Sequence, residues 1–444
     1  MTASTDAFAA IRGRAAGRPA VVLDDDPTGT QTVRDLFVLT EWDIDRIARR
    51  LTDPALFLST NSRSLEEADA VDITRDAVRT ALSAARQSGR PISLVSRSDS
   101  TLRGHFPAET LAIADAMGAP DARVLLVPFF GEGGRVTVDD VHLLDRDGIR
   151  TPVAETEFAR DATFAYRSSN LRDWVAEKYA AGGYSLPGVE SLAIDTVRTG
   201  ADAVAGALRA LPGGGVMIAN AETDPDVEAI ALGALRAEDD GLPLVARTAA
   251  SYVRARAGQP SAPSLVRDEL DVRGPGLIVV GSHVPTTTQQ MDVLTAEHPE
   301  LAVHELDIGA VLARDPRVTR RAAEALDEAL GAGRTGIVAT ERHPRDIGLA
   351  GGKAVSRALV ETVRHVRHRP AWVIAKGGIT SYDVARHCLG MAEARIAGPL
   401  LTGVPVWISG SGGRWPGVPL VVFPGNVGSR DSLLEAYRRL SGGG

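Results

Sequence analysis

Residues 20–29 read Ala20-Val21-Val22-Leu23-Asp24-Asp25-Asp26-Pro27-Thr28-Gly29, a short apolar run that ends in three carboxylates and a turn. The apolar runs at 55–58, 92–95 and 124–127 also end in polar or turn-forming residues, and helix-like segments separate them. Such alternation is typical of parallel strands covered by helices on both faces. The sequence therefore predicts an α/β fold with a mainly parallel sheet, and such sheets bind ligands at the carboxyl ends of their strands.

The second half of the chain repeats this arrangement. Apolar runs at 277–280, 372–375 and 420–423 are each followed by a turn that contains glycine, and residues 319–333 and 355–366 have helical periodicity. A chain of 444 residues is long enough for two domains. Prolines and glycines gather between Arg254 and Pro275. We therefore expect a first domain at 1–255, a linker at 256–274 and a second domain at 275–444, with the active site in the interdomain cleft.

Composition limits the classes of partner. The formal net charge is −8, which disfavours a general attraction to nucleic acid or to an anionic membrane. The single cysteine, Cys388, allows no intramolecular disulfide and is expected to be a buried apolar side chain. No run approaches the roughly 20 apolar residues of a membrane span, and the first residues contain no apolar signal segment. We expect a cytoplasmic protein with small-molecule ligands, and the sequence leaves a homo-oligomer open.

The most familiar nucleotide-binding and catalytic motifs are missing. Residues 348–353 come nearest to a P-loop, but the spacing differs and Ala354 stands where Ser or Thr is needed. No GxGxxG follows a strand, and neither GxSxG nor HExxH occurs. His365 and His368 have the spacing of a metal pair, yet arginines surround them, so a solvated basic face is the better interpretation.

Two strand ends carry the first candidate site. Three adjacent carboxylates repel one another, so residues 24–26 need a cation, a proton or hydrogen-bond partners. A solvated turn closed by Thr28 and Gly29 is the alternative. Asn61-Ser62-Arg63-Ser64 follows the next apolar run, and it either supplies further donors to the same ligand or is a plain turn.

Residues 97–105 hold a second, denser candidate site: Arg97-Ser98-Asp99-Ser100-Thr101-Leu102-Arg103-Gly104-His105. Arginine presents a planar fork that fits a carboxylate, while aspartate and hydroxyls suit a polyol. Aspartate is also able to accept a proton from an attacking hydroxyl. A helix start capped by Ser98 or Asp99 is the alternative, but it explains only one of these side chains. The loop at 131–137 adds Arg135, and it either closes over the ligand or is a long turn.

The three glycine turns of the second half suggest a phosphate-binding region. Each follows an apolar run and precedes a helix-like segment, and free N–H groups at helix starts favour phosphate. Glycines 377, 378, 425 and 428 would let the backbone approach a nucleotide closely, and Lys376 would contact a phosphate. Ordinary βα turns are the alternative, although three of them in one domain favour a nucleotide site.

Taken in order, these motifs resemble the four-carbon acid sugar kinases, whose members join a sugar-binding domain to a nucleotide-binding domain. The resemblance rests on Asp25-Asp26-Pro27-Thr28-Gly29, on residues 97–104, on Gly281-Ser282, on Gly377-Gly378-Ile379-Thr380 and on Pro424-Gly425-Asn426-Val427-Gly428. The chain departs from the family pattern at four positions. Arg97 replaces a lysine, Pro27 an aromatic residue, Ile379 an acidic residue and Pro424 a serine.

The resemblance implies transfer of the ATP γ-phosphate to a hydroxyl of a threonate, erythronate or 3-oxo-tetronate, with Mg²⁺ on the phosphates. Asp25 or Asp99 is expected to be the general base. The expected substrate-binding residues are Asp26, Thr28, Gly29, Ser62, Arg63, Arg97, Ser100, Thr101, Arg103 and Arg135. The expected ATP-binding residues are Ser282, Lys376, Gly377, Gly378, Ile379, Thr380, Gly425, Asn426 and Gly428. The sequence assigns no metal ligand. The alternatives are an NAD-linked hydroxyacid dehydrogenase and a sugar-acid sensor without turnover.

Overall fold

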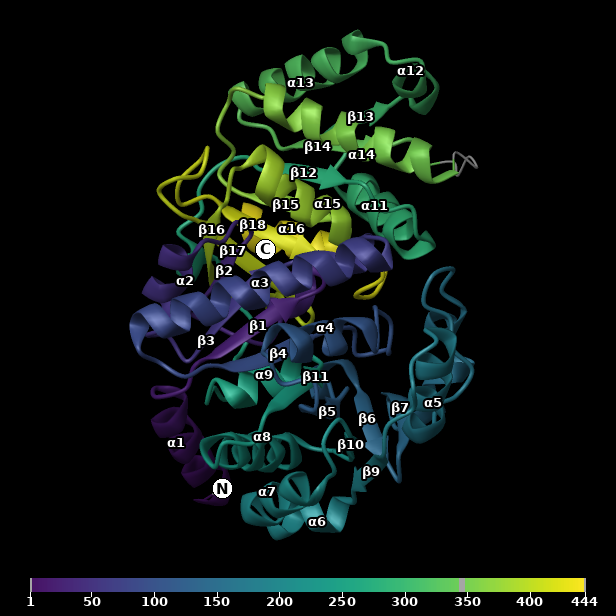
Figure 1. Ribbon diagram of the computed structural model, residues 1–444. Helices are drawn as coiled ribbons and strands as arrows, with labels where there is room; N and C mark the ends of the chain where they lie inside the picture. The colour runs from purple at the N-terminus through teal and green to yellow at the C-terminus, as the bar shows by residue number, and fades with distance from the viewer. Residues whose placement is uncertain (1, 343–347, 443–444) are drawn as a thin grey trace. The chain divides into compact units, whose positions relative to one another are not determined.

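The computed structural model describes residues 2–342 and 348–442 of the chain. The chain divides into two compact units, Met1–Ser261 and Ala262–Gly444. Each unit has its own core and a mainly parallel sheet with helices on both faces, so the predicted α/β class is confirmed (Figure 1). The two units are described separately below.

The sheet of the first unit consists of parallel strands in the order β2-β3-β1-β4-β11-β5-β10-β9. These strands are β1 (Ala20–Asp24), β2 (Leu36–Leu39), β3 (Ala55–Ser59), β4 (Ser93–Arg97), β5 (Arg123–Val127), β9 (Val189–Leu192), β10 (Val216–Ala219) and β11 (Leu244–Thr248). Asp24 pairs in register with Ser59 on one side and with Arg97 on the other. The carboxyl ends of three neighbouring strands therefore lie in a row.

Helices cover both faces of this sheet (Figure 1). One face carries α2 (Ile44–Arg50), α3 (Glu67–Ser88) and α4 (Ala108–Ala116), and the other carries α1 (Thr2–Ala15), α8 (Asp224–Asp239) and α9 (Ala250–Arg256). Two further helices, α6 (Ile194–Thr199) and α7 (Ala201–Ala210), pack on α8. In α3 the alanines 70, 77, 81 and 84 form one buried stripe, which is the helical spacing that packs against a sheet.

A small antiparallel sheet lies between β5 and β9 in the chain. It contains β6 (Arg135–Val138), β7 (Val141–Arg146) and β8 (Ile149–Pro152), and α5 (Leu171–Ala181) follows it. Trp174 of α5 stacks on Phe106 with ring centroids 4.8 Å apart. The sequence did not predict this insertion, which comprises residues 131–170 and is called the inserted segment below. It packs against the loop that follows β4, so it helps to shape the site.

The sheet of the second unit has the order β13-β14-β12-β15-β18-β17-β16. The parallel strands are β12 (Leu277–Val280), β13 (Ala302–Leu306), β14 (Gly336–Thr340), β15 (Val373–Lys376) and β18 (Pro419–Phe423). At one end β17 (Val404–Ser409) pairs antiparallel with both β18 and β16 (Glu393–Leu401). The apolar runs predicted as strands all belong to the parallel part, whereas the antiparallel pair was not predicted.

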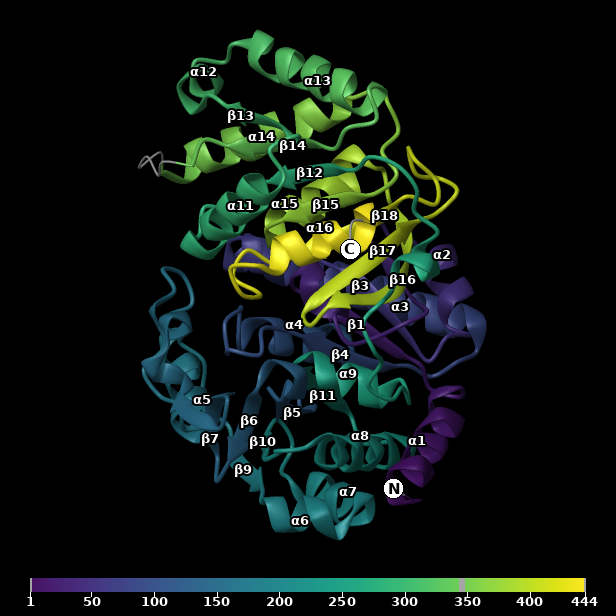
Figure 2. The same ribbon diagram turned by 180° about the vertical axis from the view of Figure 1, so that it is seen from behind.

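Helices of the second unit also lie on both faces of its sheet (Figure 2). One face carries α11 (Pro285–Glu297) and α16 (Ser432–Ser441), and the other carries α13 (Pro316–Gly331), α14 (Gly348–His365) and α15 (Gly378–Asp383), which a π-helical turn (Val384–Cys388) extends. Two short helices, α10 (Arg267–Leu270) and α12 (Ile308–Leu312), complete the unit. The helical periodicities at 319–333 and 355–366 correspond to α13 and α14. Cys388 is buried as predicted, and burial raises the pKa of its thiol to about 12.

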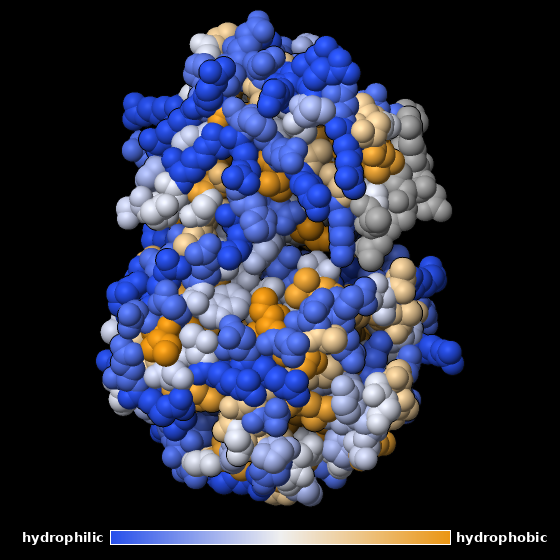
Figure 3. Space-filling model, turned by 45° about the horizontal axis from the view of Figure 1, so that its top comes forward, coloured by the Kyte–Doolittle hydropathy of each residue, from blue (hydrophilic) through white to orange (hydrophobic). Residues whose placement is uncertain are grey.

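Among residues 2–342 and 348–442, no helix has the length and apolar content needed to cross a bilayer. The face drawn in Figure 3 is predominantly hydrophilic, with hydrophobic residues scattered among polar ones.

Candidate active site

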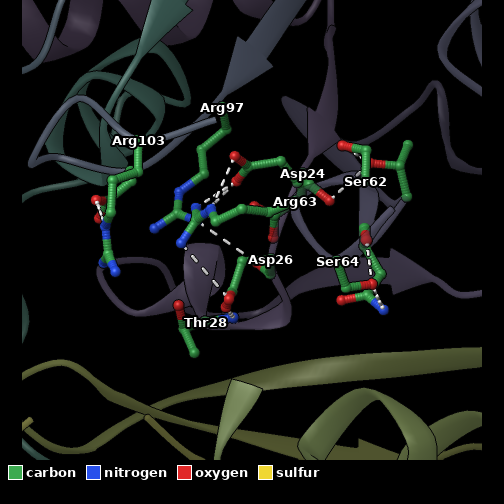
Figure 4. Close-up of polar contacts among 12 residues, drawn as sticks. Asp24, Asp26, Thr28, Ser62, Arg63, Ser64, Arg97 and Arg103 are labelled. Atoms are coloured by element: carbon green, nitrogen blue, oxygen red, sulfur yellow. Dashed lines mark hydrogen bonds and ion pairs between the residues drawn. The ribbon is translucent and has the colours of Figure 1, made fainter. Parts of the chain in front are cut away.

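The carboxyl ends of β1, β3 and β4 bring five predicted side chains together. Arg63 donates Nε and Nη2 to the two oxygens of Asp25, at 3.1 and 2.5 Å, and its Nη1 lies 3.5 Å from Asp26. Arg97 Nη1 lies 3.2 Å from Asp24 Oδ1 and 3.7 Å from Asp25 Oδ1. Figure 4 shows both arginines reaching into the space between the aspartates. We call these five residues the Asp–Arg cluster.

Backbone hydrogen bonds between neighbouring strand ends hold the cluster in place. The N–H of Asp25 donates to the carbonyl of Arg97, and the N–H of Arg63 donates to the carbonyl of Asp25, both at 3.2 Å. Between β3 and Arg63 the chain turns at Asn61, whose φ of 51° is left-handed, a conformation that asparagine tolerates better than most residues. The sequence Asn-Ser-Arg is thus a turn that directs its arginine to the aspartates.

Burial changes the protonation of the cluster. Asp24 is 0% exposed, and its removal from water raises its pKa to about 8 despite the Arg97 guanidinium. For Asp26, burial alone would raise the pKa, but Arg63 and the hydrogen bonds from Thr28 outweigh it and lower the pKa below its ordinary value. A protonated Asp24 leaves the charge of Arg97 partly uncancelled at neutral pH. The cluster is therefore suited to an anionic ligand.

The turn after Asp26 is shaped by packing rather than by solvent. Asp26 caps a 3₁₀ turn (Pro27–Thr30) by accepting the N–H of Thr28 at 2.9 Å. A Cβ at position 29 would lie 1.9 Å from Asp24 Oδ1, so only glycine leaves room for that carboxyl group. Thr28, Gly29 and Asp24 are all buried, so the alternative of a solvated turn is wrong.

The loop after β4 forms a second ionic group. Arg103 Nε donates to Asp99 Oδ2 at 2.7 Å, Thr101 also donates to that oxygen, and Arg103 Nη1 lies 3.5 Å from Asp161. For Asp99, burial would raise the pKa, but Arg103 and Arg63 outweigh it and hold the pKa well below its usual range. A carboxylate held so firmly in its ionised form is a weak proton acceptor.

This loop is not a helix start. Leu102 and Gly104 have φ values of 70° and 118°, and α4 begins only at Ala108. The alternative in which Ser98 or Asp99 caps a helix at this point is therefore wrong. The left-handed residues instead fold the loop back on the strand ends.

Two residues of the inserted segment anchor the loop. His142 lies within hydrogen-bond distance of the Ser100 carbonyl (Nε2 to O, 2.8 Å), and Tyr166 donates its hydroxyl to the Thr101 carbonyl at 2.8 Å. Because a carbonyl only accepts, the proton of His142 is on Nε2, and Nδ1 accepts from the Thr137 hydroxyl at 3.0 Å. Burial lowers the pKa of His142 to about 4, so this arrangement is kept at neutral pH.

Sequence reasoning missed two buried partners, Glu109 and Arg247. The buried Ser62 hydroxyl donates to Glu109 Oε1 at 2.6 Å, and Figure 4 shows Ser62 apart from the Asp–Arg cluster. Arg247 Nη1 lies 3.8 Å from Glu109 Oε2. Burial, with Asp25 adding to it, raises the pKa of Glu109 to about 7. Arg247 follows an apolar run at 244–246, so the search for polar residues at the ends of apolar runs would have identified it. Glu109 does not follow such a run, so its sequence context gave no indication of a role in the site.

Arg135 starts the small sheet and lies near the loop after β4. Its guanidinium carbon is 6.0 Å from the centre of the Phe158 ring, and that of Arg103 is 5.2 Å from the same ring. Asp161 and Phe158 come from the inserted segment, which had no strand-end signal, so sequence reasoning missed them as well. The first unit thus gathers the predicted arginines 63, 97, 103 and 135 around one group of strand ends.

In the second unit, three loops meet at the carboxyl ends of β12, β15 and β18. The N–H groups of Gly281 and Ser282 both lie 3.2 Å from the Lys376 carbonyl, and Gly377 donates to the Phe423 carbonyl at 2.8 Å. Thr287 Oγ1 lies 3.1 Å from Ser282 Oγ and 2.9 Å from the Gly425 carbonyl. The turns predicted separately are therefore one hydrogen-bonded group.

Glycine is required where these loops touch. A Cβ at Gly281 would lie 2.2 Å from Thr380 Oγ1, and a Cβ at Gly425 would lie 2.4 Å from Ser282 Oγ. Gly377 has a φ of 121°, which other residues rarely adopt. The close approach of the loops explains the glycines without a ligand, and it also exposes backbone to any ligand that binds there.

The loop after β18 differs from the predicted turn. Asn426 and Gly428 do not open a helix, because α16 begins only at Ser432. Gln290 of α11 fixes this loop by donating Nε2 to the carbonyls of Val427 and Ser429, at 3.1 and 2.8 Å. After β15, in contrast, residues 378–380 form the first turn of α15 directly. Ile379, which replaces an acidic residue of the family pattern, is 54% exposed there.

Lys376 occupies an unusual position. Its side chain is 0% exposed, Nζ donates to the Pro424 carbonyl at 2.7 Å, and Nζ lies 3.7 Å from the centre of the Phe423 ring. Burial lowers its pKa to about 7. Contact with a phosphate would require the ammonium group to leave this position.

This buried lysine gives a testable pH dependence. Folded Lys376 loses its proton near pH 7, whereas unfolded lysine keeps it to about pH 10.4, so the unfolded state binds more protons between these values. Burial of the protonated lysine destabilises the folded state. This destabilisation is fully present below pH 7, and it is relieved as the pH rises and folded Lys376 loses its proton. Relative to Lys376→Met, the free energy of unfolding of the wild type should increase by up to about 1.4 kcal/mol per pH unit in this window. Urea melts of both proteins at pH 6.5, 8 and 9.5 measure this.

The exposed Lys353 provides a matched control. Lys353→Met should leave the difference from the wild type constant over the same pH range. A constant difference for Lys376→Met as well would contradict the inferred neutral lysine.

The described residues contain no group of three or more His, Cys, Asp or Glu side chains that would hold a metal ion. A magnesium ion that is bound mainly by phosphates needs few protein ligands, since Mg²⁺ often keeps several of its waters. Within the Asp–Arg cluster, the buried oxygen Oδ2 of Asp24 has no hydrogen-bond partner among the described residues.

Comparisons with known proteins define the class. Residues 20–256 match the model of a sugar-binding N-terminal domain, and residues 277–433 match that of a nucleotide-binding C-terminal domain. The Asp–Arg cluster lies in the first match and the glycine loops lie in the second. This is a two-domain protein that combines sugar binding with nucleotide binding.

Its relatives specify the family. The chain is 26% identical to D-erythronate kinase of Heliobacterium modesticaldum over 95% of this chain and 90% of that protein. It is 28% identical to 3-oxo-tetronate kinase of Pseudomonas fluorescens over 78% and 77%. A crystal structure from Salmonella typhimurium LT2 has the same fold, with a TM-score of 0.68 at 16% identity over 96% and 100% of the two chains. The chain belongs to the four-carbon acid sugar kinase family.

Proposed function

We propose that the protein transfers the γ-phosphate of ATP to a hydroxyl of a four-carbon acid sugar of the threonate, erythronate or 3-oxo-tetronate type. The observation that carries this proposal is the Asp–Arg cluster with its neighbouring Asp99–Arg103 pair. It combines guanidinium groups, carboxylates and hydroxyls, which are the groups that recognise a hydroxylated carboxylate. Membership of a sugar-acid kinase family and the names of the two relatives support the same activity.

In this proposal Asp25 accepts the proton of the attacking hydroxyl. Asp99 is less suited to that role because Arg103 and Arg63 hold its pKa so low. It would instead orient Arg103. Ser62, Ser100, Thr28 and Gly29 carry no charge to match that of the acid, so their contribution would be to shape the site. Asp26, Arg63, Arg103 and Arg135 are partly exposed, so they are the charged members of this set that a ligand is able to reach.

The glycine loops of the second unit would hold ATP. Ser282, Gly377 and Gly425 form the contact point of the loops, and Gly378, Ile379 and Thr380 present the first turn of α15. Asn426 and Gly428 lie in the adjoining loop. A bound Mg²⁺ would neutralise the phosphate charge, which is the main electrostatic requirement of phosphoryl transfer.

We expect magnesium-dependent release of ADP with at least one acid from a panel of four- to six-carbon sugar acids, measured by a coupled ADP assay. Omission of either the acid or the metal should abolish the release. No ADP release with any acid of the panel, from protein that binds ATP, would reject the proposed function for this substrate class.

The same assay separates the alternatives. Calorimetric binding of an acid without ADP release would support a sensor, an idea that the exposed Ile379 and the replacement at Pro424 motivate. NADH formation from the same acids would support a dehydrogenase.

A further inference from the structure

The four candidate arginines for acid binding differ in the carboxylates of the protein with which they form ion pairs. Arg63 is held by Asp25 and Asp26, and Arg97 by Asp24 and Asp25. Arg103 is held in the same way by Asp99 and Asp161. Arg63 and Arg103 use both sides of their guanidinium forks in these pairs, so each would have to release a carboxylate of the protein to bind a ligand carboxylate through two parallel hydrogen bonds. Breaking such a buried pair is unfavourable. Arg97 engages its carboxylates through Nη1 alone and its Nε has no partner, but its side chain is only 3% exposed, so a ligand has little access to it.

Arg135 is different. Among the residues that the structure describes, it makes no ion pair with a carboxylate, and its Nη1 donates to the carbonyl of Gly133. Its Nε is buried and has no hydrogen-bond partner in the described chain. Burial lowers its pKa from the ordinary value. A ligand carboxylate would supply the missing anion.

The loop before Arg135 is built around its guanidinium group. A Cβ at Gly133 would lie 2.4 Å from Arg135 Nη1 and 2.4 Å from the Phe130 ring, so a larger residue there would displace one of these groups. A Cβ at Gly134, whose φ is 71°, would lie 2.1 Å from the Asp145 carbonyl, so this position requires glycine. Ser251 holds the loop from the other side, because its Oγ accepts the N–H of Gly131 at 3.2 Å. The arginine is therefore held in place by the fold without being neutralised.

Arg135 also faces the proposed acid-binding residues. The charged groups that act on it electrostatically are Asp99 and Arg103 of the loop after β4, with Arg146 and Glu157 of the inserted segment. The Phe158 ring lies close to the guanidinium groups of both Arg103 and Arg135. Arg247 has Glu109 at 3.8 Å and is only 2% exposed, whereas Arg135 is partly exposed.

We propose that Arg135 is the specificity-determining residue that binds the carboxylate of the sugar acid, while Arg63, Arg97 and Arg103 organise the carboxylates of the protein. This inference rests on the proposed function for the substrate class. It assigns selection for acids over neutral polyols to one side chain of the inserted segment.

The test compares a charged and an uncharged four-carbon probe. Calorimetry is carried out with D-erythronate, L-threonate and D-threonate as acids and with erythritol as the neutral polyol. For the acid that the wild type binds most tightly, Arg135→Gln should raise Kd by about 10- to 100-fold, the usual worth of hydrogen bonds to a charged group. Erythritol binding should change by less than about 2-fold, because no charge is involved. Arg135→Lys should recover part of the loss, since it keeps the charge without the planar fork.

The matched control is Arg150→Gln, because Arg150 lies on the same small sheet with its side chain 42% exposed and is not among the charged groups that act on Arg135. This variant should bind the acid like the wild type. Wild-type affinity for the acid in folded Arg135→Gln would overturn the inference, and so would an equal loss for acid and polyol. If the wild type binds an acid but releases no ADP, the kinase proposal fails while the role of Arg135 is still measured. If it binds none of the three acids, the inference fails together with the substrate class.

Discussion

Asp25→Asn should reduce kcat for sugar-acid phosphorylation by about 10²–10⁴-fold, the usual loss when a positioned proton acceptor is removed. Asn keeps the shape of the side chain and one of the two acceptors for Arg63, but it carries no charge. The carboxylate of Asp25 is also the anion shared by Arg63 and Arg97, at 2.5 and 3.7 Å. The change therefore removes both the proposed base and the charge that orders the cluster. Steady-state ADP release with saturating acid measures the effect.

Three measurements make this result specific. Thermal melting establishes that Asp25→Asn is folded, and calorimetry with ATP should give the wild-type Kd, since the glycine loops lie in the other unit. Asp72→Asn is the matched control, because Asp72 has a side chain 79% exposed on α3 and should retain full activity. Near wild-type turnover in folded Asp25→Asn would transfer the base role to Asp26 or Asp99.

Gly425→Val should raise the KM for ATP by about 10- to 100-fold, in line with the 1–3 kcal/mol that overpacking of a close contact usually costs. The added Cβ would lie 2.4 Å from Ser282 Oγ and 3.4 Å from Val284 Cγ2. The valine would push the Ser282 loop away from the point where the three loops meet. Unlike Gly377 and Gly428, Gly425 does not have a positive φ, so the substitution tests space rather than backbone strain.

Gly412→Val is the control for this second change, because a Cβ at Gly412 meets no atom within 4 Å. It should leave the KM for ATP unchanged. Direct binding of the sugar acid should survive in Gly425→Val, apart from a coupling between the ligands of roughly 1–3 kcal/mol. A folded Gly425→Val that binds ATP normally and has lost the acid would reverse the assignment of ligands to the two units.

The fold was predictable to the extent that its strands are continuous apolar runs. Buried parallel strands such as β1 and β12 appear in the sequence as continuous apolar runs because both of their faces are covered. The hairpin strands β16 and β17 and the small sheet of β6–β8 were missed. Residues in β8 are partly exposed, so their pattern lacks a continuous apolar signal. Insertions of this kind are recognised from the pairing of their strands, and a single sequence does not show which strands pair.

For the site, strand-end residues such as Asp25 and Arg97 were predictable because the carboxyl ends of parallel strands share one edge. The pairing of each arginine with its carboxylate was not predictable, because it depends on the direction in which each side chain points. Protonation was also hidden in the sequence. Asp24 and Lys376 look like ordinary charged residues, and only their complete burial moves their pKa values to about 8 and about 7. Glu109 was missed because it belongs to a helix rather than to a strand end.

The inserted segment at 131–170 has a consequence for protein engineering. It is continuous in the chain, it contributes Arg135, Phe158 and Asp161, and it holds the loop after β4 through His142 and Tyr166. Both anchors bind carbonyl groups of the main chain, so they do not depend on which side chains that loop carries. Exchanging the segment as one piece between family members should therefore transfer substrate preference, provided that its backbone pairing with Ala221 after β10 is kept.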